Sequence, residues 1–120
     1  MIYHITTPVE WTLAEQGGHY SAPSLDAEGF IHCSTIEQII PVANAFYKNE
    51  ATIILLCIDE NKLKSDLKWE PPVHLQGHDA PENSDGQLFP HVYGIINLDA
   101  VEKFVTIPKD DNGYRLPDSI

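Results

Sequence analysis

The stretch TIILLCID at residues 52–59 constrains the fold more than any other part of the sequence. Every residue at positions 53–58 is apolar, and isoleucine recurs among them. A strand of this composition is buried on both faces, which is typical of the centre of a sheet. The sequence therefore predicts a sheet built around residues 52–59.

Weaker patterns on both sides of this strand predict the other elements. Thr7, Pro8 and Glu10 supply a cap residue, a proline at the first helical position and a capping-box partner, so they predict the start of a helix. Gly17 and Gly18 predict its end. The expected helices cover residues 8–16 and 35–48, and the expected strands lie at 2–6, within GFIHCST at 29–35, and at 52–59, 67–71, 91–98 and 102–107.

The start of the second helix has more than one interpretation. Ser34 and Glu37 repeat the capping-box spacing, and Thr35 competes with Ser34 as the cap. Pro41 cannot lie in the interior of an undistorted helix. We therefore expect either a kink at Pro41, or a short turn ending at Ile40 and a longer helix beginning at the proline.

The order of these elements predicts an α+β fold in which two main helices pack on a mainly antiparallel sheet. A length of 120 residues suits a single domain. We expect its core within about residues 1–107. Residues 72–87 are rich in Pro, Gly, Asp and His and predict a mobile loop, while residues 108–120 predict a loosely held tail.

Charge and composition narrow the range of partners. Seven basic against eighteen acidic residues leave a formal charge of −11, which repels phosphate backbones and makes nucleic acid an unfavourable partner. No apolar run reaches the roughly 20 residues that a membrane span needs, and the N-terminus does not resemble a secretory signal. We therefore expect a cytoplasmic protein with reduced cysteines at Cys33 and Cys57. Oligomeric state cannot be deduced from these features.

Three histidines on predicted strands are the main candidates for a functional site: His4, His32 and His91. A single strand histidine is more often a packing or surface residue, but three of them can converge if their strands are neighbours. Glu70 is a candidate base or ribose ligand, with a surface glutamate as the structural alternative. The nearby candidates for ligand binding are Thr6, Ser34, Thr35 and Tyr93.

Three chemistries fit such a cluster. A metal site would use the histidines as ligands, but no HxH, HExxH or CxxC spacing supports one. A hydrolase would use Ser34 as nucleophile, but no GxSxG motif is present. An anion or nucleotide pocket would use Ser34, Thr35 and the free N–H groups of the following helix.

Several motifs occur together in an order that resembles a known family. IYHITT, GFIHCST, ILLCID, LKWEP, LFPHVYG and LDAV follow one another over about residues 1–107, as in the bacterial family named domain of unknown function 952 (DUF952). That family resembles the ADP-ribosyltransferase superfamily in fold. The resemblance implies a split sheet that binds NAD in a central cleft.

The resemblance also implies roles for single residues. YHIT looks like the first-strand motif whose histidine bonds the ribose of NAD, which points to His4 with Thr6. GFIHCST looks like the second-strand motif, which points to His32 and Ser34. Transferases commonly place a glutamate in the third motif, where this chain has His91 in LFPHVYG.

The expected function is therefore that of an enzyme that uses NAD or a related nucleotide as substrate. It would transfer ADP-ribose or a phosphate-linked group and would need no further cofactor. The alternative is a non-catalytic module that binds a metabolite or another protein.

Overall fold

The computed structural model describes residues 1–71 and 87–120, so nearly all of the expected loop at 72–87 lies outside the described residues. No helix in this described part is long and apolar enough to cross a membrane. The strands are β1 (Ile2–Thr6), β2 (His19–Tyr20), β3 (Ile31–His32), β4 (Thr52–Ile58), β5 (Asp66–Glu70), β6 (Phe89–Tyr93), β7 (Ile96–Asn97) and β8 (Val101–Pro108). The α-helices are α1 (Pro8–Gly17), α2 (Pro23–Glu28) and α3 (Ile39–Phe46), with 3₁₀ turns at Ile36–Gln38, Glu60–Lys62 and Leu98–Ala100.

The prediction of a central strand at 52–59 is confirmed by β4. It lies between β1 and β8 and pairs antiparallel with both. Its side chains alternate between two apolar clusters, one on each face of the sheet. Ile54, Leu56 and Ile58 belong to one cluster, whereas Ile53 and Leu55 belong to the other. This burial on both faces is why the strand is a continuous apolar run.

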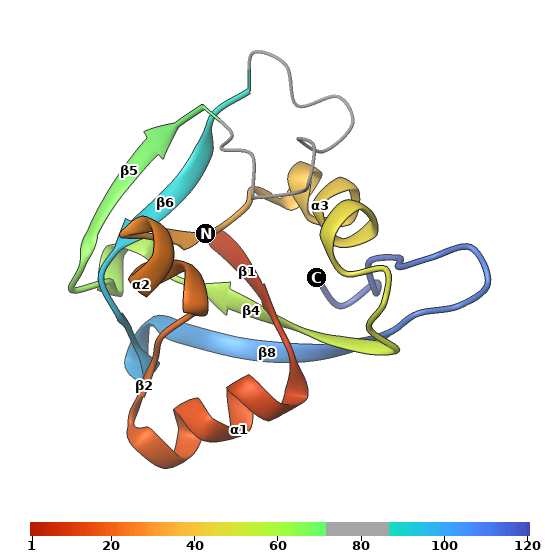
Figure 1. Ribbon diagram of the computed structural model, residues 1–120, viewed down its shortest axis with the longest axis horizontal. Coiled ribbons are helices and arrows are strands. Elements are labelled where there is room, and N and C mark those ends of the chain that lie inside the picture. Colours follow the sequence, from red (N-terminus) through yellow and green to blue (C-terminus); the bar gives the residue numbers. More distant parts are fainter. Residues whose placement is uncertain (72–86) are drawn as a thin grey trace.

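A second three-stranded sheet contains β3, β6 and β5, and β2 pairs with β7 in a small third sheet. Every strand pairing recorded between these described elements is antiparallel, which confirms the expected α+β class with mainly antiparallel sheets. Figure 1 shows β5 and β6 on one side of the molecule and β1, β4 and β8 on the other, with α1 and α3 at opposite ends of this second group.

Among the described residues, backbone pairing joins the two larger sheets at one isolated bridge, between Tyr3 of β1 and Ser34. The backbone groups of these residues exchange hydrogen bonds of 2.9 and 2.7 Å. No further ladder pair joins β1 to β3 among the residues described. Because the strands stop pairing at this point, space opens between the sheets.

The helix predictions were correct in position and partly wrong in detail. The Thr7 hydroxyl accepts from the Glu10 backbone N–H at 3.3 Å and begins α1, as expected. The second helix begins as a 3₁₀ turn whose capping box is formed by Thr35 and Gln38, so Ser34 is not the cap. Pro41 lies in the first turn of α3. Its missing N–H removes no intrahelical bond there, because the first-turn N–H groups have no partner within the helix.

Two elements were missed and one strand was overextended. Helix α2 and strand β2 lie between Gly18 and Gly29, where we predict no helix or strand from the sequence. The signal for α2 was present, because Pro23 occupies its first turn and Gly29 ends it with φ of 90°. The strand expected at 91–98 begins at Phe89, and it is divided into β6 and β7 around Gly94.

The expectation of a loosely held tail was wrong at Tyr114. This side chain is 1% exposed and packs in the cluster that contains Ile53 and Leu55. Its hydroxyl donates to the Tyr47 carbonyl at 2.8 Å, and its backbone N–H donates to Asn44 at 3.1 Å. A large aromatic ring with satisfied polar groups therefore fastens the C-terminal segment against α3.

Gly94 permits a close approach that a larger residue would block. A Cβ atom at this position would lie 2.4 Å from Ser65 Oγ and 2.9 Å from Ser65 Cβ. Ser65 is held in place by its 2.6 Å bond to the Ile95 carbonyl. We expect Gly94→Ala to lower the free energy of unfolding by about 1–3 kcal/mol in chemical denaturation.

Gly17→Ala is the matched control for that substitution. Gly17 ends α1, and a Cβ there would have nothing within 4 Å. This variant is expected to keep or raise stability, by up to about 1 kcal/mol. Equal stability of the two variants would contradict the packing argument.

Candidate functional site

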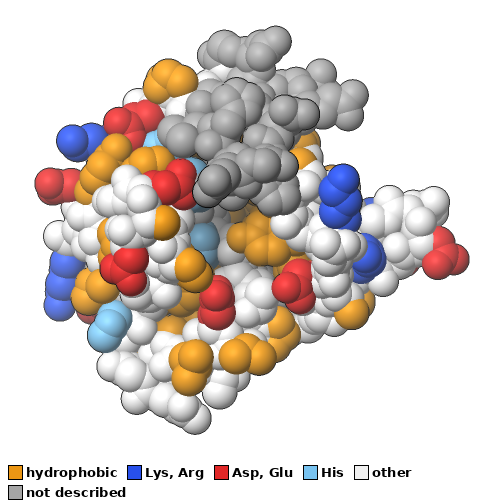
Figure 2. All heavy atoms as spheres, viewed as in Figure 1, with side chains coloured by type: hydrophobic (Ala, Val, Ile, Leu, Met, Phe, Trp, Pro, Cys, Tyr) orange, Lys and Arg blue, Asp and Glu red, His pale blue; other side chains and the backbone are white. Residues whose placement is uncertain are grey.

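A pocket of about 350 Å³ opens beside Ser34, where the two larger sheets separate. Residues of β1, α1, β2, α2, β3, α3 and β6 contribute to its walls. Figure 2 shows a hollow with a histidine at its base and acidic side chains around its rim. Sites for small molecules span about 300–1,000 Å³, so this pocket can hold a small ligand or one end of a larger one.

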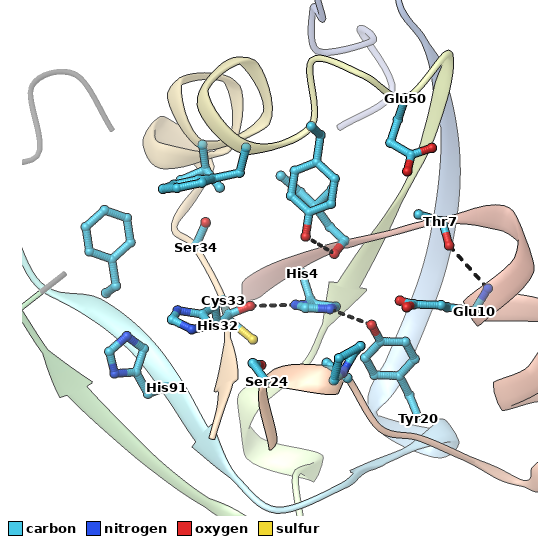
Figure 3. A pocket seen from close by; sticks show the side chains of 17 residues that line it. His4, Thr7, Glu10, Tyr20, Ser24, His32, Cys33, Ser34, Glu50 and His91 are labelled. Carbon is cyan, nitrogen blue, oxygen red and sulfur yellow. Dashed lines mark hydrogen bonds between the residues drawn. The ribbon is translucent and has the colours of Figure 1, made fainter. Parts of the chain in front are cut away.

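Four of the residues selected from the sequence line this pocket: His4, His32, Ser34 and His91. His32 and His91 are paired across β3 and β6, and their ring centroids are 5.5 Å apart. Figure 3 shows these two rings on one side of the pocket, His4 near the middle, and Glu10 and Glu50 on the other side. We call the first side the histidine end and the second the carboxylate end.

His4 occupies the place where β1 and β3 stop pairing. Its Nδ1 donates to the His32 carbonyl at 2.5 Å, which satisfies a backbone acceptor that the split leaves without a ladder partner. Its Nε2 lies 2.8 Å from the Tyr20 hydroxyl. Burial lowers the pKa of His4 to about 4, although the bond to the His32 carbonyl raises it. The ring is therefore neutral at neutral pH.

His91 and Glu70 form the best-defined acid–base pair of the histidine end. His91 Nδ1 lies 2.8 Å from Glu70 Oε1, and the ring is 1% exposed. Because the carboxylate accepts, Nδ1 carries the proton, and Nε2 of the neutral ring keeps its lone pair. Nε2 has no hydrogen bond to any residue that the structure describes. An imidazole that a carboxylate orients in this way can act as a general base.

Neighbouring groups set the protonation of this pair. Burial lowers the pKa of His91, and the bond to Glu70 partly offsets that effect. A hydrogen bond from Tyr93 and a second one from His91 lower the pKa of Glu70. Phe30 stacks on the His91 ring with a centroid separation of 4.2 Å and an interplanar angle of 24°. The pair is therefore an ionised carboxylate and a neutral, fixed imidazole near pH 7.

His32 has a carboxylate partner of its own. Its Nε2 lies 2.9 Å from Glu28 Oε2 at the end of α2. Phe30 contacts this ring as well, at 4.8 Å between centroids. The missed helix α2 therefore positions a site histidine, and the i, i+4 spacing of Glu28 and His32 was the sequence signal that could have shown it.

The carboxylate end contains acidic groups without basic ones. Glu10 and Glu50 line the pocket together with Tyr20, Phe46 and Tyr47. None of its described lining residues is Lys or Arg. The sequence of residues 72–86 contains neither Lys nor Arg. The charge of this end therefore favours a cationic ligand and disfavours a phosphate.

Two possible nucleophiles differ in their surroundings. Ser34 is 4% exposed, and its hydroxyl has no hydrogen-bond partner among the described residues. Cys33 is a free thiol whose pKa is raised by burial, so it stays protonated. Ser34 can therefore bond a ligand, whereas Cys33 is a poor nucleophile.

The other residues selected from the sequence do not line the pocket. Thr35 belongs to the capping box that begins the 3₁₀ turn. Tyr93 and Glu70 lie behind His91, and Thr6 lies between Tyr20 and Glu10. No group of three or more His, Cys, Asp or Glu residues in the described part is placed to hold a metal ion.

Sequence reasoning missed Tyr20 and Glu10 as members of the site. Tyr20 lies on β2, which no pattern predicted. Glu10 was interpreted only as the capping-box partner of Thr7. Its backbone N–H does bond Thr7, but its carboxylate accepts from the Thr6 hydroxyl at 3.1 Å. A capping interpretation accounts for the backbone of Glu10 and leaves its side chain unexplained.

Glu70→Gln tests whether the negative charge of Glu70 raises the pKa of His91. Glutamine keeps an oxygen that can accept from Nδ1 but loses the charge that raises the His91 pKa. We therefore expect the His91 pKa to fall further below its ordinary value in an NMR titration. Glu102→Gln, at an exposed residue paired with Lys62, is the control and should leave it unchanged. A rise of the His91 pKa in Glu70→Gln would contradict the pairing.

Comparison with known proteins places the chain in a family. No curated protein matches it. The crystal structure of protein CC0527 from Caulobacter crescentus is similar, with a TM-score of 0.81 and 29% identity over 98% of this chain and 96% of that one. The solution NMR structure of CC0527 has a TM-score of 0.71 and 30% identity over 94% and 89% of the two chains. The model of the family described as "Protein of unknown function (DUF952)" matches residues 5–104, and the chain belongs to that family.

Proposed function

We propose that this protein binds NAD through its nicotinamide–ribose end and breaks the bond between the two, releasing nicotinamide and transferring ADP-ribose to water or another acceptor. The observation that carries this proposal is the His91–Glu70 pair, whose Nε2 has a lone pair and no partner among the described residues of the pocket. A buried, oriented and neutral imidazole is suited to accept a proton from an attacking hydroxyl.

The charge of the pocket favours one of the two reactions that the family resemblance suggested. Transfer of a phosphate-linked group needs basic side chains that grip the phosphate, and none lines the described pocket. The nicotinamide ring of NAD carries a positive charge. Carboxylates of Glu10 and Glu50 beside the rings of Tyr20 and Tyr47 suit such a cation. The pyrophosphate would then remain outside this part of the pocket.

The two ends of the pocket fit opposite sides of the bond that breaks. Nicotinamide at the carboxylate end would leave with the electron pair of the C–N bond, and the positive charge would pass to the ribose. Water at the histidine end would add its oxygen to that carbon and give its proton to His91 Nε2. The products are ADP-ribose, nicotinamide and one proton, so the reaction balances without a further reactant.

Other features agree with an ADP-ribosyltransferase-like assignment. The two sheets separate beside β1, and His4 and Ser34 lie at that separation. His4 belongs to YHIT and Ser34 to GFIHCST, the two stretches that resemble the first-strand and second-strand motifs of that superfamily. His91 replaces the glutamate of the third motif, and its pairing with Glu70 returns a carboxylate to the same part of the site.

His91→Asn tests the proposed base. The asparagine amide can still donate to Glu70, as Nδ1 does, but it cannot accept a proton at the Nε2 position. We expect nicotinamide release from NAD to fall by about 10²–10⁴-fold, measured by chromatography, while NAD binding measured by NMR shifts of β1 and β3 remains. His19→Asn, an exposed histidine on β2 outside the pocket, should keep the wild-type rate.

Three results would decide between the proposals. Binding of NAD without release of nicotinamide would favour the alternative, a non-catalytic binding module. Absence of any shift at millimolar NAD would overturn the NAD proposal itself. Unchanged release in His91→Asn would keep the substrate and remove His91 from the mechanism.

A further inference from the structure

A continuous line of hydrogen bonds runs from His4, near the middle of the pocket, to the carboxylate end. His4 Nε2 lies 2.8 Å from the Tyr20 hydroxyl, which lies 3.0 Å from Thr6 Oγ1. Thr6 Oγ1 lies 3.1 Å from Glu10 Oε2. We call these four side chains the His4–Glu10 network. Figure 3 shows His4, Tyr20 and Glu10 following one another beside the pocket.

Counting hydrogens shows what this network needs for all its bonds to form at once. His4 Nδ1 has to carry a hydrogen, because the carbonyl of His32 can only accept. Three successive contacts link His4 Nε2 to Glu10 Oε2, and each of them needs one hydrogen. The hydroxyl groups of Tyr20 and Thr6 supply two of the three. The third hydrogen must come from an end of the network, either from His4 Nε2 or from the Glu10 carboxyl. All three bonds are therefore filled only when the network holds one shared proton.

The two arrangements differ in the direction of every bond. With the proton on His4, the imidazolium donates to Tyr20, Tyr20 to Thr6 and Thr6 to the Glu10 carboxylate. With the proton on Glu10, each group donates toward His4, and the imidazole is neutral. When a proton enters at one end of the network, the Tyr20 and Thr6 hydroxyl groups can reverse the direction of their bonds by rotating. A proton is then delivered at the other end.

Only one end of the network is accessible. His4 and Tyr20 also line the pocket, but they are only 5% and 1% exposed, and Thr6 is 1% exposed, whereas Glu10 is only partly buried. At the other end, Nδ1 terminates on a backbone carbonyl that cannot pass a proton onward. Exchange with a ligand through the network therefore occurs at Glu10.

The geometry points to a proton relay in which Glu10 exchanges a proton with the ligand and Thr6 and Tyr20 pass it to and from His4 Nε2. In the uptake direction, a ligand gives a proton to Glu10, Glu10 gives one to Thr6, Thr6 to Tyr20 and Tyr20 to His4. The net change is one proton lost by the ligand and one N–H bond formed on His4. No electron transfer or further reactant is needed.

This inference goes beyond the proposed function, because the relay does not depend on which ligand the pocket accepts. Burial opposes the imidazolium, since it lowers the pKa of His4 to about 4. His4 is thus a temporary acceptor that returns the proton. The titratable groups around the network are His32 and Cys33 from the β3 segment, Tyr20 from β2, Glu10 from α1, and Tyr47 and Glu50 from the segment after α3.

Thr6→Val interrupts the relay at its centre with a side chain of similar size. The test follows the ¹⁵N signal of His4 Nε2 and the ¹³C signal of the Glu10 carboxyl by NMR as pH changes, without ligand. In the wild type, we expect the His4 signal and the Glu10 carboxyl signal to change together as the pH changes. In Thr6→Val, we expect that response to be lost while Tyr20 remains hydrogen-bonded to His4.

Three further variants separate a broken relay from a damaged fold. Thr6→Ser restores a hydroxyl and should restore the coupled response. Tyr20→Phe keeps the buried ring and should abolish the coupled response, as should Glu10→Gln, which removes the carboxyl group at the end of the network. Amide spectra verify that each variant is folded. A His4 response in folded Thr6→Val or Tyr20→Phe equal to that of the wild type would overturn the relay, and so would its absence in the wild type.

Discussion

The contact between His4 and the His32 carbonyl sustains the opening on which the site depends. Strands that pair side by side lie about 4.8 Å apart, which leaves no room for a ligand between them. Here, pairing between β1 and β3 is limited to the Tyr3–Ser34 bridge. The imidazole of His4 bonds the carbonyl that continued pairing would have satisfied. The split therefore creates a pocket without leaving that buried backbone acceptor unpaired.

The same split gives the pocket two chemical characters. Strands β3 and β6 contribute imidazoles that are oriented by Glu28 and Glu70. Helix α1 and the segment after α3 contribute carboxylates and aromatic rings instead. Burial keeps the His4 and His91 rings neutral, because it penalises the imidazolium more than nearby hydrogen bonds favour it. The pocket can therefore attract a cation at one end and remove a proton at the other.

Patterns with a strong local cause were predicted well. The buried strand at 52–59 and the capped start of α1 follow from burial on two faces and from capping chemistry. The placement of His4, His32 and His91 on strands also followed from short-range alternation. Elements with weaker signals were missed: α2 has a proline and a glycine at its ends but only six residues and no side-chain cap, and β2 has two residues that pair with the distant β7. Tyr114 looked like part of a polar tail, because its partners Asn44 and Tyr47 are far away in the sequence.

The sequence by itself determined the α+β class, the central strand and the family, because alternation, capping and motif order are properties of neighbouring residues. It also indicated which histidines were candidates. Only the tertiary structure decided which partners those histidines have. Glu70 reaches His91 across paired strands, and Tyr20 and Thr6 join His4 to Glu10. Such partnerships depend on strand register and on where pairing stops, and those are set by the packing of the whole chain.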